Sequence, residues 1–234
     1  MIYRILPMMA LLFMSFSANQ TSSTKPRLLA ANNASAIEMK AASIYGQLHS
    51  ATISALPKME SFTKALEGFY SLKAQGKITK DVLTLVDFSL SSNAKRLWVI
   101  DLSTNTILFH SLVAHGRNTG EEFAQTFSNK AESFKSSLGF YVTGEIYNGK
   151  HGKSLKLDGQ ERGVNDNARN RAVVMHGADY VSESFIRNHH RLGRSQGCPA
   201  IPVELTDDII DAIKDKSCLF IYHPARKASS KLLS

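Results

Sequence analysis

The stretch of residues 169–202 reads RNRAVVMHGADYVSESFIRNHHRLGRSQGCPAIP and contains the candidate catalytic residues of the chain. Its apolar run Ala172–Met175 is long enough to form one buried strand, and His176 stands at the end of that run. Loops carried on rigid strands are common places for catalytic groups. Cys198 follows in the same stretch, and a cysteine needs a nearby proton acceptor to become the reactive thiolate. The layout therefore predicts a cysteine nucleophile with a histidine base.

Small and polar residues frame these two candidate groups. Gly177 follows the histidine, and seventeen residues then separate it from Ser195-Gln196-Gly197-Cys198. A glycine directly before the cysteine lets the backbone pass close to a substrate, so amide N–H groups can face a developing oxyanion. Ser195 and Gln196 are expected to support this loop, Ser195 through a hydrogen bond.

The pattern of His-Gly, a gap of this length and Ser-x-Gly-Cys resembles the catalytic signature of the L,D-transpeptidases of bacterial cell walls (YkuD-type domains). The run Ser-x-Gly-Cys-Pro-Ala is most similar to the branch called murein L,D-transpeptidase catalytic domain proteins. The resemblance extends from about Leu83 to Pro224. It implies a compact β sandwich or barrel that acts on peptidoglycan stem peptides without a metal or organic cofactor, and that carbapenems inactivate.

The resemblance also implies roles for individual residues. Cys198 would be the nucleophile, His176 the base, and Gly177 the residue whose carbonyl orients the imidazole. Backbone amides of Gly197 and Cys198 would help to form the oxyanion hole. A catalytically active Cys198 is expected to have a depressed pKa and to be alkylated quickly near neutral pH, whereas slow alkylation like that of a model thiol would count against an enzyme.

Two positions depart from the commoner signature. Gln196 replaces its second histidine, so His176 is the only plausible base within the motif. Ala200 replaces its arginine, so a cation that binds a substrate carboxylate must come from elsewhere. The candidates are four arginines that spacing does not separate, namely Arg169, Arg171, Arg191 and Arg194.

Two of these arginines belong to the polar run 165–171, just before the predicted catalytic strand. One interpretation is a solvated loop. The other is a cleft wall that meets the charged ends of a stem peptide, because the planar fork of arginine donates two parallel hydrogen bonds to a carboxylate. Both interpretations stay open at this point.

Two further His-Gly pairs compete with the pair at 176–177. His115 also ends an apolar run and could line the same cleft. His151 lies in a loop rich in Gly and Lys and is expected to face solvent. For His176 itself the structural alternative is a core histidine bonded to backbone.

The two cysteines, Cys198 and Cys218, could form a disulfide in an exported protein, but a bridge would disable the proposed nucleophile. Cys218 begins an apolar run and is expected to be a small buried hydrophobe. No cysteine or histidine spacing supports zinc, because the adjacent His189 and His190 point in different directions on a helix or strand.

The chain is predicted to contain a signal peptide (1–18), a flexible linker (19–36), a helical segment (37–80), a catalytic domain (81–225) and a tail (226–234). The apolar run of the first segment is too short to span a bilayer, which requires about 20 residues. Export with cleavage is therefore expected, with no stable membrane anchor afterwards and a location in the periplasm or cell envelope.

The fold class is expected to be mostly β with an N-terminal helical extension and short helices. Short runs bounded by polar turns predict seven strands, at 83–88, 97–102, 106–114, 139–145, 154–157, 172–176 and 218–222. A helix is expected to start at a capping Thr206, with acidic residues in its first turn.

The formal net charge of +8 suits attraction to anionic wall polymers or phospholipid surfaces. Nucleic acid is not expected as a partner, because no recognition helix, zinc finger or aromatic-basic pattern is present. The predicted function is an exported cysteine acyl-transferase that cuts a tetrapeptide stem and cross-links it to another. The alternatives are an L,D-carboxypeptidase or amide hydrolase with the same site, and a wall-binding protein without activity.

Overall fold

The computed structural model describes residues 25–50 and 55–226, with side chains from residue 36 onward. By its internal contacts the chain divides into two units, residues 1–35 and 36–234. The fold and the candidate site described below belong to the second unit.

Helix α1 (Lys25–Gln47) begins inside the predicted linker 19–36. Residues 25–36 are thus helical, and the flexible linker is not found there. Half of these residues are Leu or Ala, which are strong helix formers. The predicted signal segment 1–18 lies outside the described residues, as does the tail beyond Arg226.

Eight strands form a single sheet. They are β1 (Val82–Asp87), β2 (Leu97–Asp101), β3 (Thr106–Ser111), β4 (Gly139–Gly149), β5 (Gly152–Gly159), β6 (Val174–Gly177), β7 (Ala200–Ile201) and β8 (Cys218–Tyr222). Seven of them confirm the predicted strands to within a few residues. The eighth, β7, was not predicted, because two residues carry no periodicity.

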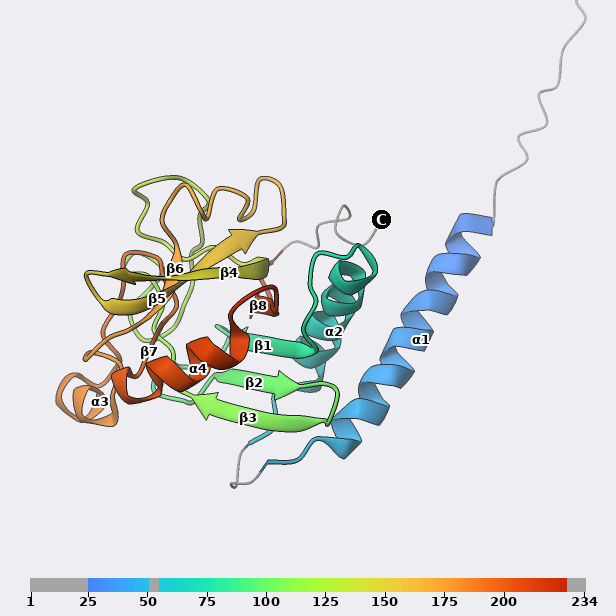
Figure 1. Cartoon of the computed structure of the whole chain (residues 1–234), viewed down its shortest axis with the longest axis horizontal. Coiled ribbons are helices and arrows are strands. Elements are labelled where there is room, and N and C mark those ends of the chain that lie inside the picture. Colours follow the sequence, from blue (N-terminus) through green and yellow to red (C-terminus); the bar gives the residue numbers. More distant parts are fainter. Residues whose placement is uncertain (1–24, 51–54, 227–234) are drawn as a thin grey trace, which may run out of the picture. The chain divides into compact units, whose positions relative to one another are not determined.

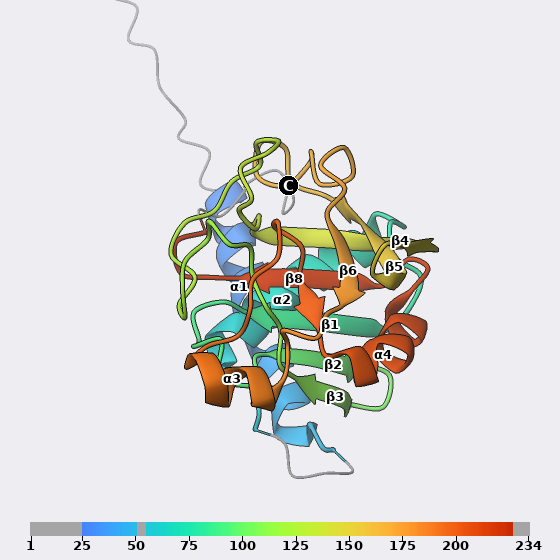
Figure 2. The same ribbon diagram turned by 90° about the vertical axis from the view of Figure 1, so that its left-hand side faces the viewer.

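The strand order is β3-β2-β1-β8-β4-β5-β6-β7, and Figure 2 shows β4, β8, β1, β2 and β3 in this order from top to bottom. Neighbours are antiparallel except β1 with β8 and β6 with β7. Beyond β3, the backbone N–H of Ala114 donates to the Ala200 carbonyl of β7 at 2.8 Å. The two edges of the sheet are thereby joined, and the mostly β prediction is confirmed as a nearly closed barrel.

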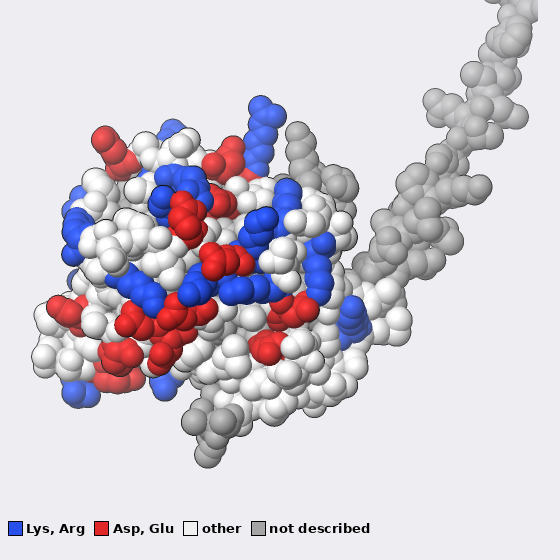
Figure 3. All heavy atoms as spheres, viewed as in Figure 1, with Lys and Arg blue, Asp and Glu red and all other residues white. Residues whose placement is uncertain are grey.

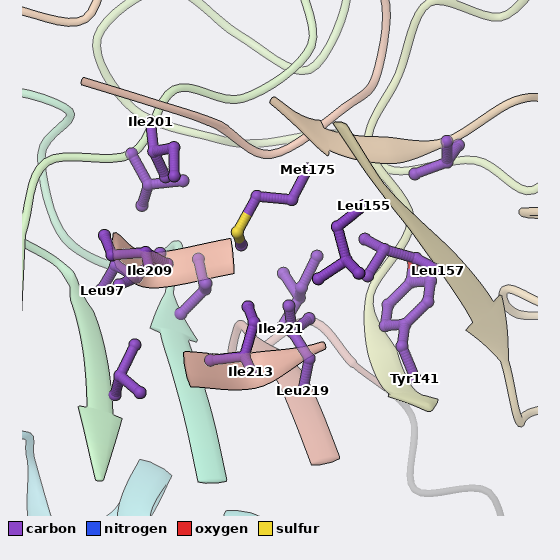
Figure 4. Close-up of a cluster of buried hydrophobic side chains, with 14 of the residues drawn as sticks. Leu97, Tyr141, Leu155, Leu157, Met175, Ile201, Ile209, Ile213, Leu219 and Ile221 are labelled. Atoms are coloured by element: carbon purple, nitrogen blue, oxygen red, sulfur yellow. The ribbon is translucent and has the colours of Figure 1, made fainter. Parts of the chain in front are cut away.

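The alternating side chains of β8 separate two apolar clusters. Leu219 and Ile221 point into the interior of the barrel, where Figure 4 shows them with Met175 of β6. Cys218, Phe220 and the ring of Tyr222 belong to the second cluster, on the other face of the sheet. Full burial of one such Leu or Ile side chain contributes about 1.5–3 kcal/mol.

Helix α2 (Met59–Ala74) covers the second face of the sheet by packing on β1 and β8. Its buried residues Phe62, Leu66 and Phe69 recur at helical spacing, and the helix lies within the predicted helical segment 37–80. The helix ends near Gly76, whose φ of 68° suits a residue without a side chain. In the described part of the chain, no helix has the length and apolar character needed to cross a membrane.

Three short helices complete the fold, namely α3 (Glu183–His189), the 3-10 helix η1 (Val203–Leu205) and α4 (Thr206–Ile213). Figure 1 shows α4 in front of the sheet. The prediction that Thr206 caps α4 is wrong. Because η1 runs directly into α4, Thr206 is already helical, and its hydroxyl donates to the Pro202 carbonyl at 3.0 Å.

Candidate active site

A cleft of about 570 Å³ opens where the β4–β5 hairpin, β6 and the loop before β7 meet. We name residues 194–199 of that loop the nucleophile loop. The lining comes from segments 132–134, 147–154, 171–176 and 194–198, together with Tyr180. His176 and Cys198 therefore line one cleft although they belong to different elements.

His176 is held at the end of β6, between Ser154 of β5 and Ala200 of β7. Only 3% of the residue is exposed. Its Nδ1 lies 2.8 Å from the Gly177 carbonyl oxygen, which can only accept, so Nδ1 carries the hydrogen. Nε2 is thus the unprotonated nitrogen, and no atom of the described chain donates to it.

Burial lowers the pKa of the His176 imidazole, because the charged form loses solvation. The hydrogen bond to Gly177 opposes this shift, while the nearby His151 and Lys150 lower the pKa further. His176 is accordingly neutral near pH 7 and can accept a proton.

The half-buried Cys198 lies beside the same strand. The backbone N–H of Val174 donates to Sγ at 3.5 Å, and Sγ lies 3.7 Å from the Ala172 carbonyl oxygen. The parallel pairing of His176 with Ala200 explains this position, because Val174 and Cys198 each come two residues earlier. The thiol is therefore set alongside the strand that carries the imidazole.

The expected depression of the thiol pKa is wrong. Burial raises the pKa of Cys198, and the Val174 N–H, Arg171 and Lys150 offset this only in part. The cleft thus holds a neutral thiol and a neutral imidazole at rest. Such a pair transfers its proton during attack on a substrate, so the imidazole has to act as a general base.

Hydrogen bonds inside the nucleophile loop bear on the predicted oxyanion hole. The Gly197 N–H donates to Ser195 Oγ at 3.0 Å, and Ser195 Oγ donates to the Cys198 carbonyl at 2.6 Å. Ser195 thus braces the loop, but the Gly197 N–H is already used. The Cys198 N–H has no acceptor within the described chain and is the amide left for an oxyanion.

The pair His115-Gly116 supports the nucleophile loop from behind. The Ser195 N–H donates to the His115 carbonyl at 3.0 Å. The Gly116 N–H donates to Ser136 Oγ at 3.0 Å, which in turn donates to the Gly197 carbonyl at 3.1 Å. A side chain at Gly116 would meet the Phe134 carbonyl oxygen at 2.5 Å, so a residue without a Cβ is needed at this contact.

The expectation that His115 could line the cleft is wrong. Its side chain is buried, Arg96 Nη2 donates to Nδ1 at 2.8 Å, and Nε2 lies 3.2 Å from the Gly120 carbonyl oxygen. Burial, followed by the charge of Arg96, lowers its pKa to about 4. His115 is a neutral structural residue whose two ring nitrogens are both bonded.

The candidate arginines are occupied by protein partners. Arg171 lines the cleft, but its two Nη atoms donate to Ser137 Oγ, Ser133 Oγ and the carbonyls of residues 128 and 135. Arg194 also lines the cleft, and its Nη1 donates to Glu121 at 2.6 Å and to two carbonyls. Arg171 uses both Nη atoms and Arg194 uses Nη1 to hold neighbouring loops, while both side chains contribute positive charge to the cleft.

Arg169 and Arg191 do not line this cleft. Arg169 forms ion pairs with Asp158 of β5 and Glu145 of β4, and it faces a separate cavity of about 380 Å³. Arg191 pairs with Glu121 at 3.0 Å. Figure 3 shows how closely basic and acidic side chains intermix on one face of the molecule. Such pairing of surface charges leaves these two arginines little freedom to bind a carboxylate.

Two further cleft residues lie in the turn between β4 and β5, and the sequence indicated no role in the cleft for either. His151 is exposed but does not simply face solvent, because its ring stacks on that of His176 with 4.3 Å between centroids. Lys150 lines the cleft, and its ammonium has no partner among the described residues. A turn rich in Gly and Lys gives no sign that hairpin register brings it to a site.

Both cysteines are free, and Cys218 lies fully buried on β8. Cys218 is therefore the buried hydrophobe that was expected, and burial raises its pKa far above the ordinary value for a thiol. Among the described residues, no group of three or more His, Cys, Asp and Glu side chains could hold a metal ion.

Comparison with known proteins adds independent information. The family description "L,D-transpeptidase catalytic domain" matches residues 55–222. An L,D-transpeptidase from Mycobacterium smegmatis is 11% identical over 61% of this chain and 59% of that chain, with a TM-score of 0.38. One from Stackebrandtia nassauensis is 12% identical over 82% and 93% of the two chains, with a TM-score of 0.36.

The chain thus covers about three fifths of the length of the mycobacterial structure. No curated protein matches the sequence. The family match includes α2, all eight strands and the entire cleft lining. Because this match covers more than half of the sequence, the chain belongs to the L,D-transpeptidase catalytic domain family.

Proposed function

We propose that the chain is an exported cysteine acyl-transferase that cross-links peptidoglycan stem peptides in the periplasm or cell envelope. One observation carries the proposal. The Cys198 thiol and the His176 imidazole line one cleft, and the Gly177 carbonyl holds that imidazole with Nε2 available. A thiol requires such a proton acceptor to become a nucleophile. Membership of the family supports the same type of reaction.

The first half-reaction acylates Cys198. Nε2 of His176 takes the thiol proton as Sγ attacks an amide carbonyl carbon of a donor tetrapeptide stem, which forms a C–S bond and a tetrahedral oxyanion. The oxyanion collapses, the C–N bond breaks, and the terminal D-residue leaves as an amine that takes the proton from His176. The product is a thioester on Cys198.

The second half-reaction transfers the acyl group. The side-chain amine of a second stem attacks the thioester carbonyl, and His176 accepts the proton that this amine loses. The C–S bond breaks, and His176 returns the proton to Sγ. The product is an amide link between two third-position diamino acids, and no group is oxidised or reduced. Water in place of the amine would give a carboxypeptidase.

Backbone and lysine groups would hold the charges of the substrate. The free Cys198 N–H is the proposed oxyanion donor, because preorganised amides stabilise charge that develops in the transition state. Lys150 is the proposed partner of a stem carboxylate, since the cleft arginines are engaged by the protein. Arg171 and Arg194 would add positive potential without direct contact.

The test uses the purified protein and a disaccharide-tetrapeptide, with products followed by mass spectrometry. Cys198→Ala is compared with Cys218→Ala, which removes the other thiol from a buried strand remote from the cleft lining. Dimers that lack one terminal D-Ala are expected from the wild type and from Cys218→Ala. A loss of about 10⁴-fold or more is expected for Cys198→Ala, because no other group can form the acyl-enzyme.

Other outcomes would change the assignment. Tripeptide without dimer would indicate that water is the acceptor. An untouched substrate, with no covalent adduct after incubation with a carbapenem, would contradict the catalytic proposal and favour a wall-binding protein.

A further inference from the structure

The turn between β4 and β5 brings a second histidine onto the candidate base. Gly149 and Gly152 pair with each other, so Lys150 and His151 form the tip of the hairpin. The ring of His151 lies 4.3 Å from that of His176, with an angle of 18° between the two planes. The rings are therefore stacked face to face rather than joined by a hydrogen bond.

The stacked ring of His151 contacts a face of the His176 imidazole that its hydrogen bond does not reach. Within the described residues, the only hydrogen bond of the His176 ring runs from Nδ1 to the Gly177 carbonyl, and it fixes one edge of the ring. The stacked ring of His151 covers one face of the imidazole, so it restricts tilting of the ring about this bond and adds to its burial.

We propose that His151 is a positioning residue for the base, because its ring packs on one face of His176 and fixes the imidazole plane. The catalytic consequence rests on the proposed function. The contact itself does not, since it concerns two side chains of the folded protein. His151 touches His176 rather than the reacting atoms, so it acts through the base.

The charges around His176 are consistent with this role. Lys150 belongs to the same turn. Together with His151, it disfavours a positive charge on His176. Cys198 is neutral at rest because burial raises its pKa. The other ionisable groups that line the cleft are Glu132, Tyr147, Arg171, Tyr180 and Arg194. Only one of them is a carboxylic acid, whereas two are arginines, so the cleft as a whole disfavours an imidazolium.

Two substitutions distinguish the packing of the His151 ring on His176 from the electrostatic effect of His151. His151→Ala removes the ring, whereas His151→Phe keeps a flat ring over His176 that cannot ionise. His189→Ala is the matched control, because His189 is also an exposed histidine stacked on a ring, that of Phe185 at 4.0 Å, and it does not line the cleft. All variants are made in the full chain.

The first readout is the protonation of His176, followed by NMR titration of its ring resonances and assigned with His176→Gln. In His151→Ala the midpoint is expected at higher pH than in wild type, because the imidazolium gains solvation and loses a repelling neighbour. In His151→Phe it is expected to lie between the two. His189→Ala is expected to leave it unchanged.

The second readout is the dependence of kcat and kcat/KM on pH. At high pH, His151→Ala is expected to lower kcat about 10- to 100-fold, because a loosened base is badly placed for proton transfer. His151→Phe is expected to recover most of this loss. The decline of kcat/KM on acidification is expected to begin at higher pH in His151→Ala.

Two results would overturn the inference. One is a His176 titration midpoint that is identical in wild type and His151→Ala. The other is activity that vanishes at every pH in His151→Ala and survives in His176→Gln, which would make His151 itself the base. If the wild type shows no turnover, the proposed function fails, but the NMR titration still decides whether His151 controls His176.

Discussion

The pairs His115-Gly116 and His176-Gly177 have the same sequence and opposite chemical characters. In the first, Arg96 donates to one ring nitrogen and a backbone carbonyl lies within hydrogen-bonding distance of the other. In the second, only Nδ1 is bonded, and the ring lines a cleft that also holds a thiol. A buried histidine with both nitrogens bonded supports the fold, whereas one with a free nitrogen at a cleft can transfer a proton.

The largest difference is expected in activity. His176→Gln should lower kcat/KM about 10²- to 10⁴-fold, because the general base is lost. His115→Gln should leave kcat per folded molecule within about threefold of the wild-type value, since the His115 side chain does not reach the cleft. The measurement is turnover of a disaccharide-tetrapeptide, normalised to the folded fraction by circular dichroism. Equal losses in the two variants would show that the two pairs do not differ as the structure indicates.

The second difference concerns stability against pH. The pKa of His115 is lowered to about 4 in the fold, whereas an unfolded histidine titrates near 6.5. Between these values the unfolded chain binds more protons than the folded chain. The stability that the neutral His115 ring contributes is therefore complete above about pH 6.5, and it is lost progressively as the pH falls to about 4. The expected contribution is about 3 kcal/mol.

Urea unfolding at pH 7 and at pH 4 measures this contribution. Because other groups also titrate in this window, the comparison is with His115→Phe, which has no titrating ring. The loss of stability on acidification should be smaller in the variant. An equal loss in both proteins would mean that His115 is not held neutral by the fold.

The third difference concerns the glycines that follow the two histidines. A Cβ at Gly116 would meet the Phe134 carbonyl oxygen at 2.5 Å, whereas one at Gly177 would meet the side-chain Oγ1 of Thr206 at 2.3 Å. Backbone yields less than a side chain, so Gly116→Ala should destabilise the fold by about 2–3 kcal/mol and Gly177→Ala by about 1 kcal/mol. Thermal unfolding compares the two variants.

The double variant Gly177→Ala/Thr206→Ala is the control for that explanation. It removes the atom that the new Cβ would meet, so it should be more stable than the sum of the two single changes predicts. Strict additivity would argue against the contact. No second substitution can relieve the contact at Gly116 in this way, because the atom that a Cβ would meet there is the backbone carbonyl oxygen of Phe134.

The smallest expected effect is on thiol reactivity. Because burial raises the pKa of Cys198, its thiolate fraction at pH 7 is below that of a free cysteine. Iodoacetamide should alkylate Cys198 more slowly than it alkylates glutathione at pH 7. The rate of alkylation of Cys198 should keep rising at pH values above those at which an ordinary thiol is fully ionised. Rapid alkylation at pH 7 would indicate a preformed thiolate–imidazolium pair.

Several features of the fold followed from local patterns. Seven strands and the α2 helix were predicted because alternation and helical spacing depend only on residues a few positions apart. The two-residue strand β7 was missed, since it exists only through its pairing with β6 and Ala114. Thr206 was taken for a cap because the 3-10 helix before it has no separate sequence signal.

The candidate site divides in the same way. The pattern around His176 and Cys198 suggested a base and a nucleophile before any geometry was known, and the structure brings both to one cleft. The sequence could not show which arginines pair with acidic residues and which line the cleft, because their ion partners are distant in the sequence. The depressed thiol pKa was expected from the motif, whereas burial of the sulfur shifts it the other way.

Residue type and short spacing indicated the mostly β class and predicted a cysteine nucleophile with a histidine base, and the resemblance of one motif indicated the family. Which His-Gly pair faces a cleft, which amide remains free and which histidine covers the base became clear only in the folded chain. These depend on strand register and on contacts such as His151 with His176, between residues on different strands. Hydrogen bonding and solvation at each atom are fixed only when such segments meet, so no local pattern records them.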